Sequence, residues 1–205
     1  MLTLYTAATA NGQRAAILLE EAGIEYAVRK VDLAAGEHMS VEMLGLNPAG
    51  RIPFLVADGS EDAVYGSLAI GHYAAERNSA LLPGPELIPQ MHQWIGIVMT
   101  DLVPAFAGQF YLGTLAPEPD KWAVDWYSGI VRRFLQVIED HLAKEPYFVG
   151  GEYSLVDALM YPTAATSVAR LEGGLANWPN ISDWAARVGE RPAVQRGMNA
   201  CPGPL

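Results

Sequence analysis

Two polar side chains near the start of the first predicted helix can stabilise an anion. Thr9 and Asn11 both carry hydrogen-bond donors. Apolar residues at helical spacing from Ala15 onward, followed by Gly23, predict a helix over residues 11–22. The free N–H groups and positive dipole end of a helix start favour negative charge. A purely structural interpretation also stays open, because Asn is a common N-cap and a Thr hydroxyl is readily satisfied by the backbone.

A second anion-binding position is predicted at another helix start. Gly66 and Ser67 precede an apolar periodic segment that predicts a helix from Ser67 to Arg77. The hydroxyl of Ser67 and the neighbouring backbone N–H can bind a carboxylate. Serine is equally suited to a plain N-cap, and the two roles are compatible.

A proline interrupts the predicted strand between these two positions. Residues 47–50, read Asn-Pro-Ala-Gly, predict a turn, and residues 51–56 predict a strand. Pro53 has no N–H to give to a sheet, which confines it to a strand start, an edge or a bulge. A cis Ile52–Pro53 bond would reconcile the turn with the strand.

The elements around these residues predict an α/β unit over residues 1–78. Residues 2–5 and 26–33 alternate as strands on either side of the first helix, which predicts a right-handed crossover and parallel pairing. Tyr5 is interpreted as a cross-strand or core aromatic. A short helix is expected within residues 37–46. Residues 63–65 predict the returning strand of a hairpin.

The rest of the chain predicts helices alone. Prolines and glycines between residues 79 and 89 predict a linker, and residues 90–205 form the second expected domain. Helical patterns occupy residues 90–113, 120–144, 154–171 and 181–190, with a short helix after Pro192. Ser154 and Asp157 have the spacing of a capping box.

Composition excludes several classes of partner. The 205 residues contain 51% hydrophobic residues, and 13 basic against 23 acidic side chains give a net charge of −10, which argues against nucleic acid and anionic membranes. Residues 1–12 lack the pattern of a signal peptide and no apolar run approaches a membrane span, so a cytoplasmic location is expected. Cys201 is the only cysteine, and no histidines lie one helical turn apart, so no metal is expected.

Three segments in this order resemble the cytosolic glutathione transferases, and the resemblance covers the whole chain. They are residues 47–53 (Asn-Pro-Ala-Gly-Arg-Ile-Pro), residues 66–70 (Gly-Ser-Leu-Ala-Ile) and residues 150–158 (Gly-Gly-Glu-Tyr-Ser-Leu-Val-Asp-Ala). The resemblance implies a thioredoxin-like α/β N-terminal domain followed by an all-α C-terminal domain. Residues 9–12 (Thr-Ala-Asn-Gly) most resemble the bacterial Nu class, in which a Thr-x-Asn loop replaces the catalytic Tyr, Ser or Cys of other classes.

The resemblance also implies the roles of individual residues. Asn11 and Thr9 would stabilise the thiolate of glutathione, the co-substrate. The implied glutathione-binding residues are His38 and Arg51 at the glycyl carboxylate, Ile52 and Pro53 along the peptide backbone, Gly66 and Ser67 at the γ-glutamyl group, and Arg132 near the ligand. Relatives usually have Glu, Gln or Asp where this chain has Gly66, so a side chain that would hold the γ-glutamyl amine is missing.

Several functions fit these residues. The leading hypothesis is an enzyme that transfers the glutathione thiolate to a small apolar electrophile or uses it to reduce a disulfide. It would act as a homodimer, with the second-substrate pocket in the helical domain. Gly66 and Ala10, which cannot activate a thiol, favour the alternative of a non-catalytic binding or scaffold protein. Catalysis by the protein's own thiol is a third hypothesis, for which Cys201 is poorly placed.

Overall fold

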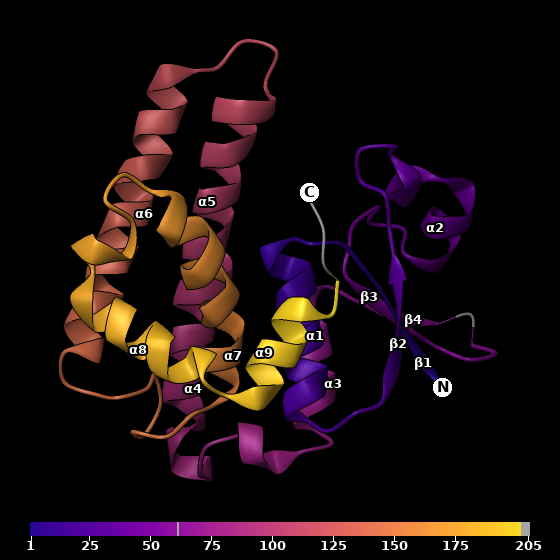
Figure 1. Ribbon diagram of the computed structural model, residues 1–205, viewed down its shortest axis with the longest axis horizontal. Coiled ribbons are helices and arrows are strands. Elements are labelled where there is room, and N and C mark those ends of the chain that lie inside the picture. Colours follow the sequence, from indigo (N-terminus) through magenta and orange to yellow (C-terminus); the bar gives the residue numbers. More distant parts are fainter. Residues whose placement is uncertain (61, 202–205) are drawn as a thin grey trace. The chain divides into compact units, whose positions relative to one another are not determined.

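The computed structural model describes residues 1–60 and 62–201 (Figure 1). By its internal contacts the chain forms two compact units. The first contains residues 1–82 together with the residues from Val188 onward, and the second contains residues 83–187. Our expected division differs in two respects, since it placed all of residues 90–205 in the helical domain and treated residues 79–89 as a linker, whereas the two units meet at residues 82 and 83.

The first unit is built on a four-stranded sheet with the order β2-β1-β3-β4. The strands are β1 (Leu2–Thr6), β2 (Tyr26–Lys30), β3 (Phe54–Ala57) and β4 (Ala63–Tyr65). β1 pairs in parallel with β2, as predicted, while the β1–β3 and β3–β4 pairs are antiparallel. Tyr5 stacks on its cross-strand neighbour Phe54 with ring centroids 4.5 Å apart, which confirms its packing role.

The first unit also contains several helices. They are α1 (Ala10–Glu21), η1 (Glu37–Met39), α2 (Val41–Leu46), α3 (Ser67–Ala75), η2 (Ser79–Leu81) and α9 (Pro192–Asn199). In Figure 1, α1 and α3 lie on one side of the sheet, and α9 packs along α1. Residues from β1, α1, β3 and α3 form one apolar core: Leu4, Ala15, Ala16, Leu19, Leu55 and Ile70.

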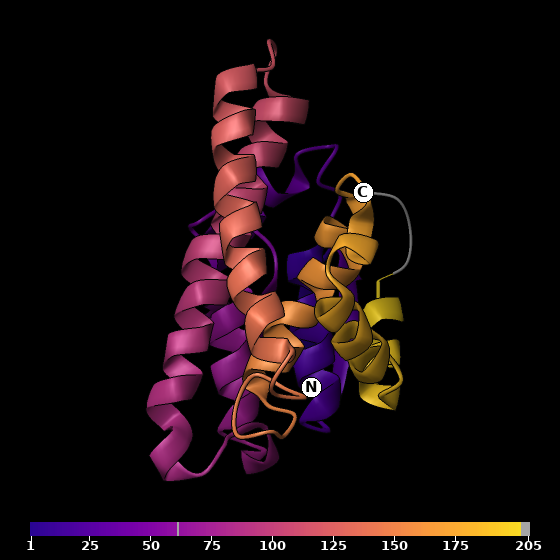
Figure 2. The ribbon, with the colours of Figure 1, turned by 90° about the vertical axis from the view of Figure 1, so that its left-hand side faces the viewer.

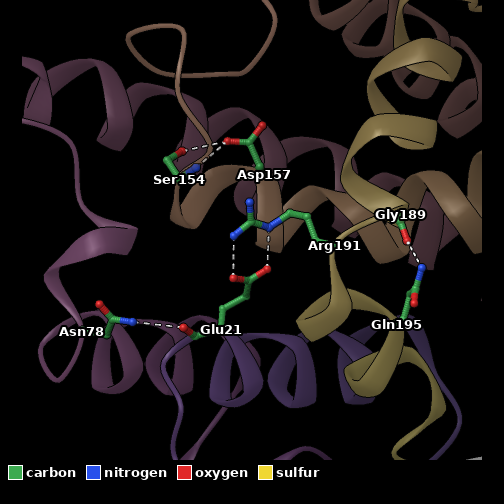
Figure 3. Close-up of polar contacts among 7 residues, drawn as sticks. All are labelled: Glu21, Asn78, Ser154, Asp157, Gly189, Arg191 and Gln195. Carbon is green, nitrogen blue, oxygen red and sulfur yellow. Dashed lines mark hydrogen bonds and ion pairs between the residues drawn. The ribbon is translucent and has the colours of Figure 1, made fainter.

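Ion pairs and close packing join α9 to α1. Arg191 donates to both carboxylate oxygens of Glu21, at 2.7 and 2.8 Å (Figure 3). Arg196 pairs with Glu20 at 2.6 Å. A Cβ added to Gly197 would lie 2.5 Å from the backbone of Ile17, so only glycine permits this approach of the two helices.

The second unit consists mainly of helices. They are η3 (Pro85–Leu87), α4 (Ile88–Gly96), η4 (Ile97–Leu102), α5 (Val103–Phe110), η5 (Tyr111–Leu115), α6 (Lys121–Leu142), α7 (Leu155–Pro162), η6 (Thr163–Ser167), η7 (Val168–Arg170), η8 (Gly174–Asn177) and α8 (Pro179–Gly189), which continues into the first unit. α5 packs against α6, and the two run side by side in both views (Figures 1 and 2).

The helical run from Pro85 to Leu115 corrects one expectation. By length and composition alone it could cross a membrane, because one 18-residue window within it has a mean hydropathy of 1.4, whereas we expected no uninterrupted apolar run that approaches a membrane span. Its parts pack on α6 and α7 within the second unit. One such helix is weak support for a membrane location, since core helices of soluble proteins have the same composition.

The predicted capping box is present at the start of α7. Ser154 N and Oγ both donate to Asp157 Oδ2 at 2.9 Å (Figure 3). Trp184 Nε1 donates to the other oxygen, Oδ1, at 2.8 Å. Asp157 is fully buried, and this burial raises the pKa of its carboxyl to about 6.

Candidate functional site

Thr9 is the N-cap residue of α1. Its Oγ1 accepts a hydrogen bond from Gly12 N at 3.0 Å, and its backbone is extended, with φ −111° and ψ 159°. α1 therefore begins one residue earlier than the sequence predicted, and Asn11 lies inside the first turn instead of capping it. The Thr9 hydroxyl still has its hydrogen to donate, because a hydroxyl accepts and donates at once.

Arg14 connects the two predicted anion-binding positions. It is fully buried on α1, and its Nη1 donates to Asn11 Oδ1 and, at 3.4 Å, to Ser67 Oγ. Asn11 is exposed, whereas Ser67 is 6% exposed at the first position of α3. Burial lowers the pKa of Arg14 to about 10, so the guanidinium is charged at neutral pH. The starts of α1 and α3 thus meet around one buried positive charge.

Gly66 turns the chain from β4 into α3. Its φ of 93° and ψ of 133° lie in a region that glycine adopts freely and other residues adopt only with strain. Its N–H donates to Pro53 O at 3.0 Å, which ties the start of α3 to the proline loop. A Cβ at this position would meet no atom within 4 Å. Backbone conformation, and not lack of space, therefore favours glycine at this position.

The Ile52–Pro53 peptide bond is cis, in agreement with the sequence analysis. β3 begins only at Phe54, where its pairing with β1 starts, three residues later than the strand predicted from Arg51, and Pro53 just before it has no N–H to give to the ladder. Asn47 supports the loop. Its Nδ2 donates to Arg51 O at 2.6 Å and its Oδ1 accepts from Ala49 N at 3.0 Å.

Among the described residues, no backbone group pairs with the N–H or C=O of Ile52. Ile52 is half-buried and forms no backbone hydrogen bond within residues 1–60 and 62–201. Its neighbour Arg51 is exposed and Pro53 is buried. An extended ligand can therefore pair with the N–H and C=O of Ile52 as a further strand would.

His38 and Arg132 are the two remaining predicted residues. His38 is half-buried in η1, and its Nδ1 is buried with no hydrogen-bond partner in the described part of the chain. Arg132 is exposed on α6, in the second unit.

The aromatic residues on the helices of the second unit, where the second-substrate pocket is expected, differ in burial. Phe106 is buried, but Phe110, Tyr111 and Trp122 are 44%, 46% and 71% exposed.

Within residues 1–60 and 62–201, no three His, Cys, Asp or Glu side chains are grouped to hold a metal ion.

Sequence reasoning missed Arg14 and the support given by Asn47. Arg14 lies four residues before Leu18, on a face that is buried along α1, so its position on the helix was a usable signal. Asn47 was assigned to the turn, but its bond to Arg51 O depends on the folded loop and leaves no mark in the sequence.

Comparison with known proteins identifies the family. Residues 10–77 match the model of the glutathione S-transferase N-terminal domain, and residues 93–192 match that of the C-terminal domain. The chain is 30% identical over 204 residues to glutathione S-transferase 3 of Zea mays, covering 95% of this chain and 91% of the relative. The chain belongs to the glutathione S-transferase family.

Two further relatives extend the comparison for this glutathione transferase. It is 30% identical to the disulfide-bond oxidoreductase YfcG of Escherichia coli, over 97% of this chain and 94% of that protein. A glutathione transferase of Pseudomonas putida, crystallised with one glutathione disulfide bound per subunit, superposes with a TM-score of 0.88 at 29% identity, covering 98% and 92% of the two chains. The thioredoxin-like sheet followed by helices is the fold of this family, as the sequence predicted.

Proposed function

We propose that this glutathione transferase binds glutathione against the starts of α1 and α3 and stabilises its thiolate for transfer or disulfide reduction. The observation that carries the proposal is the Asn11–Arg14–Ser67 chain of hydrogen bonds, which joins a thiolate-binding position to a carboxylate-binding position. Relatives crystallised with glutathione or its disulfide support the same ligand.

The bound tripeptide would be held at three places. Ser67 Oγ and the N-terminal N–H groups of α3 bind the γ-glutamyl carboxylate, and the unpaired backbone of Ile52 beside Pro53 pairs with the peptide. Arg51 and His38 bind the glycyl carboxylate. Gly66 contributes its backbone alone, and we propose Arg132 as a further ligand-binding residue.

The thiol would lie at the start of α1. A free cysteine thiol has a pKa of about 8.5, so the site must favour the charged sulfur. Asn11 and Thr9 donate hydrogen bonds to it, and the dipole of α1 adds positive potential. This requires no tyrosine, serine or cysteine at residue 10, consistent with a Nu-class assignment.

Disulfide reduction is the reaction that we favour, because two relatives are named disulfide-bond oxidoreductases. Conjugation to an apolar electrophile starts from the same thiolate, and the helical unit would supply the pocket for that second substrate. We also propose a cytoplasmic homodimer with no nucleic-acid or membrane partner.

Calorimetry and activity assays test this function. Glutathione and its disulfide are titrated into the wild type, and turnover is measured with 2-hydroxyethyl disulfide and 1-chloro-2,4-dinitrobenzene. Asn11→Ala should lower turnover at least ten-fold, whereas Asn199→Ala, at the end of α9, should not change it. Thr9→Ser keeps the hydroxyl and is the control for Thr9→Ala, which removes the donor hydroxyl together with the cap.

Each outcome decides between functions. No binding of either form at millimolar concentration would refute a glutathione function. Binding without turnover of any substrate would favour the scaffold alternative, for which Gly66 and Ala10 are the supporting residues. A monomeric mass across micromolar concentrations would refute the homodimer.

A further inference from the structure

The Arg14 side chain can donate hydrogen bonds but cannot accept them. The guanidinium carries five N–H groups and no lone pair, and it cannot reverse its polarity as an amide or hydroxyl can. Its Nη1 contacts Asn11 Oδ1 and Ser67 Oγ, which lie 56 residues apart in sequence (67 − 11). Both partners are therefore forced to act as acceptors on the side that faces Arg14.

This contact fixes the orientation of the Asn11 amide. An asparagine side chain presents an acceptor oxygen on one side and a donor NH₂ group on the other. Because Oδ1 is held by Arg14 and Asn11 is exposed, the NH₂ group is the end left for a ligand. A thiolate accepts hydrogen bonds and donates none, so it requires this orientation and would be repelled by the reverse.

The contact with Arg14 also orients the hydroxyl of Ser67. Its oxygen accepts from Arg14, so its single hydrogen can turn toward a ligand instead of toward Arg14. A carboxylate also accepts only. Both ligand-facing groups thus present donors, as the two anionic parts of glutathione require.

We propose that Arg14 is a positioning residue that sets the hydrogen-bond polarity of the glutathione site, turning the Asn11 amide toward the thiolate and the Ser67 hydroxyl toward the γ-glutamyl carboxylate. This inference rests on the proposed function and adds to it a residue that need not touch the ligand. Because Arg14 is completely buried, water cannot offer Asn11 and Ser67 other donors or acceptors on the side that faces Arg14.

Replacing Arg14 with groups of different polarity tests the inference. Lysine keeps a cationic donor, glutamine offers both a donor and an acceptor, and methionine offers neither. The thiol pKa of bound glutathione is read from the ultraviolet absorbance of the thiolate, and the Kd of S-methylglutathione reports the γ-glutamyl end without a thiol.

Arg14→Gln and Arg14→Met should raise the thiol pKa by about one unit and weaken S-methylglutathione about ten-fold. Arg14→Lys should restore both quantities to within about three-fold of the wild type. A folded Arg14→Gln variant with the wild-type thiol pKa and Kd would overturn the inference, as would a lysine variant no better than glutamine.

Asn11→Asp provides a test that does not disturb the buried arginine. The carboxylate keeps an acceptor for Arg14 but has no donor for the ligand. The thiol pKa should rise by at least one unit while the Kd of S-methylglutathione changes less than two-fold, and an unchanged thiol pKa would overturn the inference. If the wild type binds no glutathione, the proposed function fails; if it binds and these variants behave as wild type, only the role of Arg14 fails.

Discussion

Arg14 Nη1 lies 3.4 Å from Ser67 Oγ, a contact that joins α1 to α3 across 53 residues of sequence. Ser67→Ala removes the acceptor of this contact and the donor for the γ-glutamyl carboxylate. We expect glutathione and S-methylglutathione to bind about ten-fold more weakly, because one charge-assisted hydrogen bond contributes about 1.5 to 3 kcal/mol. The thiol pKa should stay near the wild-type value, since Asn11 keeps its own bond to Arg14. Calorimetry measures both affinities, and an equal loss with Ser67→Thr would show that the hydroxyl is not the cause.

Gly66 offers a direct test of the missing acid. Gly66→Glu should lower the free energy of unfolding by about 1 to 3 kcal/mol, because its φ of 93° strains any residue with a Cβ. Gly66→Ala carries the same strain without a carboxylate and serves as the control. We expect the Glu variant to bind glutathione about ten-fold more tightly than the Ala variant, through the γ-glutamyl amine. Equal affinities of these two variants would mean that the amine is held elsewhere.

The buried carboxyl of Asp157 makes stability depend on pH. Burial raises its pKa to about 6 in the folded protein, above the value of about 3.9 expected when unfolded. Between these values the folded state binds the proton more tightly, so this group should stabilise the fold by up to about 2 to 3 kcal/mol as pH falls from 7 to 4. Urea unfolding of Asp157→Asn should lack this component. A variant whose pH profile parallels that of the wild type would exclude Asp157 as the source.

Asp157→Asn should also be less stable at pH 7. The amide replaces one of two acceptor oxygens that bind Ser154, Trp184 and the backbone of Phe148, which leaves a buried donor poorly matched. A loss of about 2 to 3 kcal/mol is expected from the unsatisfied groups. Ser182→Ala, on the half-exposed side of α8, provides a control.

Two glycine-to-alanine substitutions should have opposite effects on stability. In Gly197→Ala the new methyl lies 2.5 Å from the backbone of Ile17, and overpacking of α9 on α1 should cost about 1 to 3 kcal/mol or more. Gly129 is exposed within α6 with no atom near its added Cβ, so Gly129→Ala should stabilise by about 0.5 to 1 kcal/mol. Chemical denaturation measures both. Equal effects of the two substitutions would mean that α9 can move away from α1 without a loss of stability.

Local patterns predicted most elements because each follows from neighbours in the sequence. The periodicity from Ala15 to Ala22 placed α1 within one residue at each end, and the alternation at residues 63–65 placed β4. The Ile52–Pro53 segment was informative because a turn and a strand compete there. The ends of strands and helices were predicted wrongly where a contact with a residue far away in the sequence sets them. One example is β3, whose first residue is set by pairing with β1.

The candidate site was predicted in part. Asn11 and Ser67 were identified from helix starts, but the arginine between them was not, because arginine is rarely fully buried and was not considered as part of the apolar face. Its burial depends on α3 lying over α1, which no local pattern specifies. The packing of α9 on α1 was missed for the same reason.

The contact between α1 and α9 also bears on how the protein is made. Arg191 and Glu21 are separated by 170 residues, so α1 leaves the ribosome long before its partner helix is synthesised. Until then the surface of α1 that meets Gly197 is uncovered, and contacts of such long sequence separation slow folding. The helix that carries Asn11 and Arg14 is therefore fully packed only after the intervening helices have been translated. A ribosome stalled before residue 188 would display a nascent chain in which the unit that contains the sheet lacks one of its own helices.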